Sequence, residues 1–119
     1  MNFTEIIKKL NESYLKIKKR LMPYSSVYGS WPRSGEIDLT EVHGNRKIMN
    51  WGTNVGINQT TSDLHFGPSA SCNGFMKTLK IKNSNVGLNE NFNRFKLVWT
   101  SSDIKFYFND VIYGTVNPS

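Results

Sequence analysis

The stretch WPRSGEIDLTEVHGN, residues 31–45, predicts a single β-strand near residues 35–42 that carries three carboxylates. Pro and Gly precede the strand and Gly-Asn follows it, which is the usual punctuation of a strand. The acids are Glu36, Asp38 and Glu41. Acids are poor strand formers, and like charges on one face repel each other. An arrangement with such a cost suggests that the three groups act together.

Side chains alternate along a strand, so Glu36 and Asp38 share one face while Glu41 points to the other. A β-bulge between Asp38 and Glu41, with Leu39 or Thr40 as the extra residue, would return Glu41 to the first face. Two carboxyl groups about 5–5.5 Å apart suit a retaining glycosidase, and a third between them could hold a proton. The spacing alone also leaves open a metal site or a plain acidic surface, although the pattern of a calcium loop is missing.

Length and composition indicate one small domain of 119 residues, 38% of them hydrophobic and 13% aromatic. The formal net charge of +6 would suit nucleic acid or an anionic membrane. However, six of the fifteen basic residues lie among the first twenty, so we expect no nucleic-acid partner. No apolar run is long enough for a membrane span, and MNFTEIIKKL lacks the apolar core of a signal peptide. The lone cysteine, Cys72, excludes an intrachain disulfide.

The N-terminal segment predicts a basic amphipathic helix over residues 3–21, ended by Pro23. Its apolar residues recur at spacings of three and four with lysines between them: Phe3, Ile6, Ile7, Leu10, Tyr14, Ile17 and Leu21. Such a helix would either bind a membrane surface or a partner, or simply cover the domain with one solvated face.

The rest of the chain predicts short strands separated by Gly, Asn and Ser. We expect them near residues 35–42, 62–67, 74–81, 92–100, 103–109 and 111–116. The last three form a meander with turns at 101–102 and 109–110. Trp99 alternates with Phe95 and Leu97, which predicts that it lies in the core. Strands at this spacing are typical of a sandwich or barrel.

The residues around the acids carry a specific resemblance. YGSWPRSGEIDLTEVHGN resembles the signature of glycoside hydrolase family 16, Glu-x-Asp-x-x-Glu preceded by Trp-Pro-x-Ser-Gly. It is most similar to the laminarinase-like and β-1,3-glucan-recognition branch of invertebrates. GNRKIMNWGTNVGINQTTSDLHFGP and FNRFKLVWTSSDIKFYFNDVIYGTV resemble two further segments of that family. The resemblance covers roughly residues 21–118.

The resemblance implies an all-β fold, part of a concanavalin-like β-jelly-roll sandwich, here with an extra N-terminal helix. We therefore expect a helical segment without a family match over residues 1–21 and a partial family domain over residues 22–119. The family domain is about twice this length, so the sequence is expected to be part of a larger or truncated domain. The resemblance also implies an extracellular protein, although no signal peptide is visible on this chain.

The resemblance further implies roles for the three acids and for their neighbours. Glu36 would be the nucleophile, Glu41 the acid/base and Asp38 the assisting carboxylate between them. Trp31 would offer a flat face to a sugar ring, Arg33 would bond sugar hydroxyls or pair with an acid, and His65 would reach into the cleft. Trp51 and Phe66 are weaker candidates for sugar contacts.

Two functions from different classes follow from the resemblance. The first is hydrolysis of internal β-1,3-glucosidic bonds in laminarin-type β-glucan by a retaining mechanism, with no cofactor and no metal. The second is recognition of β-1,3-glucan in innate immunity without cleavage. Relatives of the second kind commonly lose the catalytic glutamates, and this sequence keeps all three acids, which favours the first. An inactive fragment is the third possibility.

Overall fold

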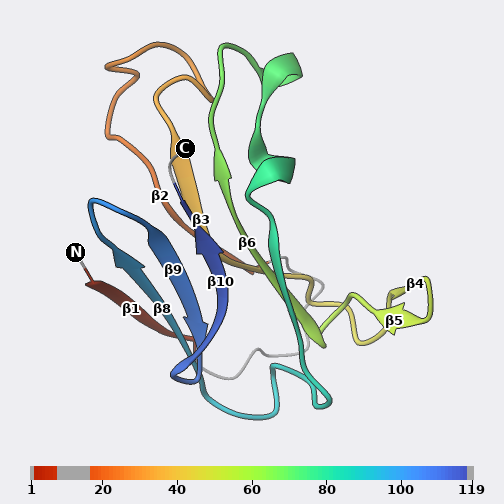
Figure 1. Ribbon diagram of the computed structural model, residues 1–119. Coiled ribbons are helices and arrows are strands. Elements are labelled where there is room, and N and C mark those ends of the chain that lie inside the picture. The colour runs from red at the N-terminus through yellow and green to blue at the C-terminus, as the bar shows by residue number, and fades with distance from the viewer. Residues whose placement is uncertain (1, 8–16, 118–119) are drawn as a thin grey trace.

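The computed structural model describes residues 2–7 and 17–117 and consists mainly of two antiparallel β-sheets (Figure 1). One sheet has the strand order β1-β8-β9-β10, formed by Asn2–Ile7, Asn93–Trp99, Ile104–Phe108 and Val111–Val116. The other has the order β2-β3-β6-β7, formed by Ile17–Leu21, Glu36–Val42, Gln59–His65 and Lys80–Asn83. The expectation of an all-β sandwich is confirmed.

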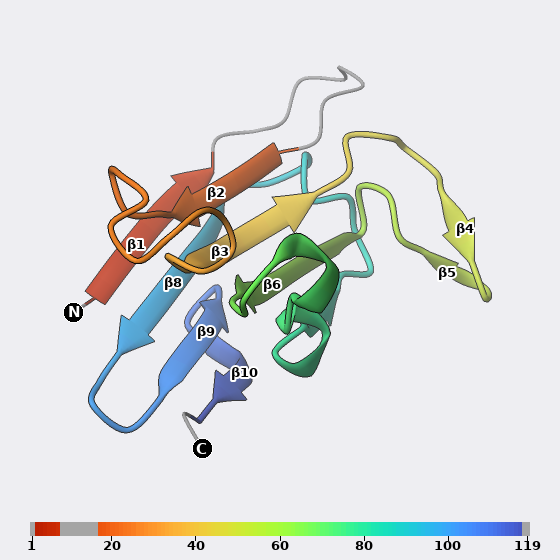
Figure 2. The same ribbon diagram turned by 90° about the horizontal axis from the view of Figure 1, so that it is seen from above.

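The remaining elements are small and lie at the periphery. Strands β4 (Met49–Asn50) and β5 (Thr53–Asn54) form a hairpin that projects away from both sheets (Figure 2). Two 3₁₀ turns, η1 (Ala70–Cys72) and η2 (Phe75–Lys77), lie between β6 and β7. Within the described ranges, neither of these short turns could cross a membrane.

The core lies between the two sheets. Ile37 and Leu39 of β3 face Phe95 and Leu97 of β8, and the cluster continues onto Ile104 and Phe106 of β9. Phe95, Leu97 and Phe106 are at most 1% exposed. A smaller cluster is formed by Val42, Ile57 and Leu88. The apolar face of the β3 sheet is therefore buried, and its opposite face is left for polar side chains.

The N-terminal helix predicted over residues 3–21 is wrong where the structure describes this segment. Asn2–Ile7 is strand β1, paired with β8, and Ile17–Leu21 is strand β2, paired with β3. Residues 8–16 lie outside the described residues. Sheet pairing overrides the helical spacing because alternation also fits β2, in which Lys18 and Arg20 contact acids while Leu21 packs on the core. The proposed division of the chain at residue 21 stays a prediction.

The strand predictions are confirmed best in the C-terminal meander. Strands β8, β9 and β10 pair in sequence, and Asn109 and Asp110 have the positive φ angles, 48° and 66°, of a tight hairpin turn. The strand predicted over residues 74–81 is wrong in its first half, where η2 forms. Trp99 was expected in the core, but it ends β8 and is 45% exposed. The alternation therefore predicted the buried side chains of β8 correctly as far as Leu97, but not Trp99.

Leu97→Ala should lower the free energy of unfolding by about 2–5 kcal/mol, because a buried side chain leaves a cavity between the sheets. Urea unfolding followed by circular dichroism measures the difference. Val111→Ala is the control, since Val111 is 64% exposed, and it should change the free energy by no more than about 0.5 kcal/mol. Equal effects of the two substitutions would contradict this position of the core.

Candidate active site

A tight loop brings the chain into β3 and places Trp31 over the first acid. Gly35 has a φ of +82°, which favours glycine, and Glu36 follows it as the first residue of the strand. The Ser34 hydroxyl donates to the Gly29 carbonyl at 2.7 Å and thereby closes the loop. The Trp31 indole N–H donates to Glu36 Oε2 at 2.6 Å. The loop therefore fixes one oxygen of Glu36.

The predicted bulge in β3 is confirmed. The register of β3 shifts between Asp38 and Glu41 against β6, and the register against β2 also skips Leu39. Leu39 still packs in the core, and Val42 joins the second apolar cluster. The Leu39 carbonyl accepts a hydrogen bond from Ser62 at 2.6 Å, which satisfies a polar group in the interrupted ladder.

The three acids share one face, where the side chain of Lys18 joins them. Lys18 Nζ lies 2.9 Å from Glu36 Oε1, 2.7 Å from Asp38 Oδ2 and 3.3 Å from Glu41 Oε1. The three carboxylate side chains are only 3%, 0% and 16% exposed. A single ammonium group therefore balances part of the charge of three largely buried acids.

The surroundings separate the pKa values of the first two acids. Burial alone would raise the pKa of Glu36, but hydrogen bonds, first from Lys18, outweigh it and hold the pKa below its usual range. Burial raises the pKa of Asp38 to about 7, against the opposing hydrogen bond from Lys18 and with support from the neighbouring Glu36. As the pH falls, a proton shared by this pair is therefore taken first by Asp38.

His65 reaches the same face from β6, held between two aromatic rings. The ring centroids of Trp31 and Phe75 each lie 5.3 Å from that of His65. Asn73 accepts backbone N–H bonds from residues 66 and 75 through its oxygen, so its amide nitrogen donates to His65 Nδ1, at 2.7 Å. The proton of His65 is then on Nε2, which donates to Asp38 Oδ2 at 3.0 Å.

Three contributors were missed by the sequence analysis: Lys18, Asp63 and Asn73. Asp63 Oδ1 lies 3.1 Å from His65 Nε2, and burial raises the pKa of Asp63 while His65 opposes the rise. The alternation of β6 could have found Asp63, two residues before His65 on the same face. Lys18 was hidden because its segment was interpreted as a helix.

The other predicted contacts are more scattered. Trp31 is 42% exposed and lines, with Met22, Tyr24 and Gly35, a hollow of about 200 Å³ that none of the three acids lines. Arg33 donates to the Pro68 carbonyl at 3.3 Å rather than pairing with an acid of the described chain.

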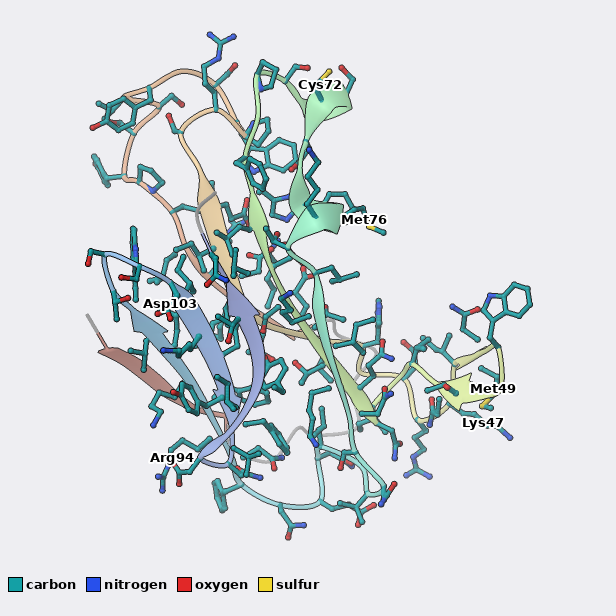
Figure 3. The ribbon with its side chains drawn as sticks, in the orientation of Figure 1. Lys47, Met49, Cys72, Met76, Arg94 and Asp103 are labelled. Carbon is teal, nitrogen blue, oxygen red and sulfur yellow. The ribbon has the colours of Figure 1, made fainter. Side chains whose placement is uncertain are left out.

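Trp51 and Phe66 make no hydrogen bond or ring contact with the acids or His65 within the described part of the chain. Trp51 is 99% exposed and lies in the turn between β4 and β5. Figure 3 shows Met49 of the same hairpin far from the two large sheets. Phe66 follows β6, is 41% exposed and packs closely against the backbone of Gly74. Neither position supports a sugar contact next to Glu36.

Two overlapping groups of acids and histidine come close enough to share a cation. Their ligand atoms lie within 4.8 Å of one another, in Glu36 with Asp38 and His65, and in Asp38 with Glu41 and Asp63. Lys18 already brings a positive charge to three of these carboxylates. An ion would therefore have to displace the ammonium group.

Comparisons with known proteins agree with the motif. The sequence is 36% identical over 99 residues to a β-1,3-glucan-binding protein of Penaeus monodon, covering 82% of this chain and 26% of that protein. It is 34% identical over 95 residues to a glucan endo-1,3-β-glucosidase of Cryptopygus antarcticus, covering 80% of this chain and 31% of the relative. The chain thus spans less than a third of the length of these relatives. No family model matches the sequence.

Solved structures show the same fold. A family 16 endo-glucanase from Bacteroides ovatus superposes with a TM-score of 0.72 at 21% identity, over 96% of this chain and 45% of that one. The laminarinase catalytic domain of Thermotoga maritima also gives 0.72, at 14% identity, over 98% of this chain and 42% of that one. The resemblance to glycoside hydrolase family 16 is confirmed. The described sheets correspond to part of the jelly roll of that family.

Asp38→Asn should change how stability depends on pH. The pKa of Asp38 is raised in the folded chain from 3.8 to about 7, so the folded state binds this proton more tightly than the unfolded state. The wild type therefore loses stability as the pH rises from about 4 to about 7. The lowered pKa of Glu36 acts between about 2 and 4.5 and so overlaps only the lower end of this window. The variant lacks the buried anion, so it should gain on the wild type across the window by about 1–4 kcal/mol, the upper end being the whole window at about 1.4 kcal/mol per pH unit.

Urea unfolding at several pH values in this window measures the gain. Asp110→Asn is the matched control, because Asp110 lies in an exposed turn with a positive φ that asparagine also accepts. A constant difference between Asp38→Asn and the wild type would show that Asp38 titrates in the same way in the folded and unfolded chains.

Proposed function

We propose that this chain carries the acid–base centre of a retaining glycosidase that cleaves internal β-1,3-glucosidic bonds of laminarin-type β-glucan. The observation that carries the proposal is the gathering of Glu36, Asp38 and Glu41 around one point on the face of the β3 sheet opposite the core. This arrangement is what a two-carboxylate mechanism requires.

The spacing of the outer glutamates supports a retaining rather than an inverting mechanism. Glu36 Oε1 and Glu41 Oε1 lie 2.9 Å and 3.3 Å from the same nitrogen atom, so they are no further apart than the sum of these distances. That sum is below the roughly 6.5 Å at which the spacing of inverting enzymes begins. Too little room is left for a water molecule on the far side of a sugar.

The environments of the acids suit the proposed roles. Glu36 has a lowered pKa, so it is ionised as a nucleophile should be. It would attack the anomeric carbon while Glu41 gives its proton to the departing glycosidic oxygen. Water would then attack the anomeric carbon of the glycosyl-enzyme and give a proton to Glu41. The bond between the sugar and Glu36 would break in the same step. Asp38, between them with a raised pKa, would hold a proton beside Glu36 and fix its orientation.

The choice of substrate rests on the relatives and on the aromatic surface. The names of the two curated relatives refer to β-1,3-glucan binding and to endo-1,3-β-glucosidase activity. The exposed face of Trp31 and the hollow beside it offer a place for a pyranose ring next to Glu36. We expect no cofactor, and the extracellular location implied by the resemblance stays a prediction.

Recognition of β-1,3-glucan without cleavage is the second candidate, and one observation favours it. The Lys18 ammonium lies 3.3 Å from Glu41 Oε1, where a general acid would have to give its proton to the glycosidic oxygen. Binding through Trp31 does not require that proton.

Glu36→Gln should lower the rate of laminarin hydrolysis by roughly 10³-fold or more while binding is kept, because the amide cannot form the covalent intermediate. Product analysis of laminarin digests measures turnover, and calorimetry with laminarihexaose measures binding. Glu90→Gln, the same change on an exposed loop residue, should leave both unchanged. An active Glu36→Gln variant would refute the assignment of the nucleophile. A wild type that binds but does not cleave would support glucan recognition.

A further inference from the structure

The position of Lys18 is set by the register of the sheet. Lys18 of β2 is directly opposite Glu41 of β3, and Arg20 is opposite Asp38. Neighbouring residues across two strands lie close together, so the backbone itself carries the Lys18 side chain to the acids. The side chain is 27% exposed and its nitrogen contacts all three carboxylates. The three N–H donors of an ammonium group match these three acceptors.

The Lys18 nitrogen occupies the space that a substrate needs. In a retaining mechanism the anomeric carbon faces the nucleophile and the glycosidic oxygen faces the acid, so both lie between the two carboxyl groups. Lys18 Nζ lies there, 2.9 Å from Glu36 Oε1 and 3.3 Å from Glu41 Oε1. A glycosidic bond and the ammonium group cannot fill the same place.

We propose that Lys18 is an autoinhibitory contact, whose ammonium group closes the acid–base centre until a glucan chain displaces it. The proposal rests on the proposed function of the site. It adds that the described conformation is closed. Only molecules in which Lys18 has left the acids can bind glucan, so the apparent affinity is the affinity of the open form multiplied by the fraction that is open.

The charges around Lys18 make this contact strong. The acids facing it are Glu36, Asp38 and Glu41 of β3 and Asp63 of β6, and the other groups at the site are His65 of β6 and Arg20 of β2. Burial would lower the pKa of Lys18, but hydrogen bonds and the charges of the acids outweigh it and raise the pKa above its usual range. Lys18 therefore stays charged at neutral pH.

Arg20 is a useful contrast on the same strand. Its Nη1 lies 3.6 Å from Glu36 Oε1, and its side chain is 55% exposed. It touches the rim of the site and does not lie between the two glutamates. The inhibition we propose therefore belongs to Lys18, and removing Arg20 should not open the space for a glycosidic bond.

Lys18→Met tests the proposal, because methionine keeps the length of the side chain and removes its charge. Calorimetry with laminarihexaose should show a dissociation constant about tenfold lower than that of the wild type. Carbon-13 titration of the side-chain carboxyls should show the pKa of Glu36 raised by about one unit, since Lys18 holds it down. Lys18→Arg should keep that pKa low, a result that a merely structural role would not give.

Lys47→Met is the matched control, because Lys47 is exposed beside the projecting hairpin (Figure 3). It should leave the dissociation constant and the pKa of Glu36 unchanged, and Arg20→Gln should give less than a threefold change in affinity. If Lys18→Met does not fold, nitrogen-15 spectra of the wild type decide the question. Bound laminarihexaose must then release the Lys18 ammonium into fast exchange with water.

The outcomes separate this proposal from the proposed function. Equal affinities of the wild type and Lys18→Met, or a Lys18 signal unchanged by bound hexaose, would overturn the inhibition while leaving glucan hydrolysis possible. Tighter binding by Lys18→Met without hydrolysis by any variant would support the inhibition and overturn the catalytic function. An absence of hexaose binding in every variant would overturn both.

Discussion

The bulge in β3 is the constraint on which the acidic site depends. A strand with regular alternation cannot place Ile37, Leu39 and Val42 in apolar clusters and also place Glu36, Asp38 and Glu41 on the opposite face. One extra residue reconciles the two sets, and both neighbouring strands follow the same shift. The core and the site are therefore two consequences of one irregularity, and neither can be formed without the other.

The electrostatic balance of the site comes from three strands. Strand β3 supplies the three acids, β6 supplies Asp63 and His65, and β2 supplies Lys18 and Arg20. Burial disfavours the charged form of each of these acids and of the lysine, so the charged forms that persist are the ones stabilised by opposite charges nearby. Asp38 and Asp63 are the exceptions, since burial leaves the pKa of each carboxyl raised, and Asp38 accepts a proton before Glu36 when the pH falls. The site is thus a coupled set of groups and not a row of independent carboxylates.

The sequence was sufficient where local rules and tertiary structure agree. Alternation, turn residues and the flanking motif predicted β3, its bulge and the C-terminal meander, because each depends on neighbours close in sequence. The prediction for the segment around Lys18 was wrong because its apolar spacing fits a helix. Its pairing with β3 is a long-range contact that no local sequence pattern reveals. The predicted burial of Trp99 was wrong for a related reason. Alternation tells which face of the sheet a side chain is on, but not whether another layer covers that face. Asn73 lies in a loop, and only the folded chain brings it to His65.

Strand β2, which carries Lys18, lies at the edge of its sheet as the described residues form it. It can therefore change while the strands that carry the acids stay the same. An edge strand is held by hydrogen bonds on one side only, so it is the element most easily replaced by another extended segment. The acids and the histidine belong to the interior strands β3 and β6 and would keep their places after such an exchange. Glu36 and its charge partner Lys18 are therefore separable parts of the same sheet. A substitution or strand exchange confined to β2 could convert a closed acidic site into an open one without altering the acids themselves.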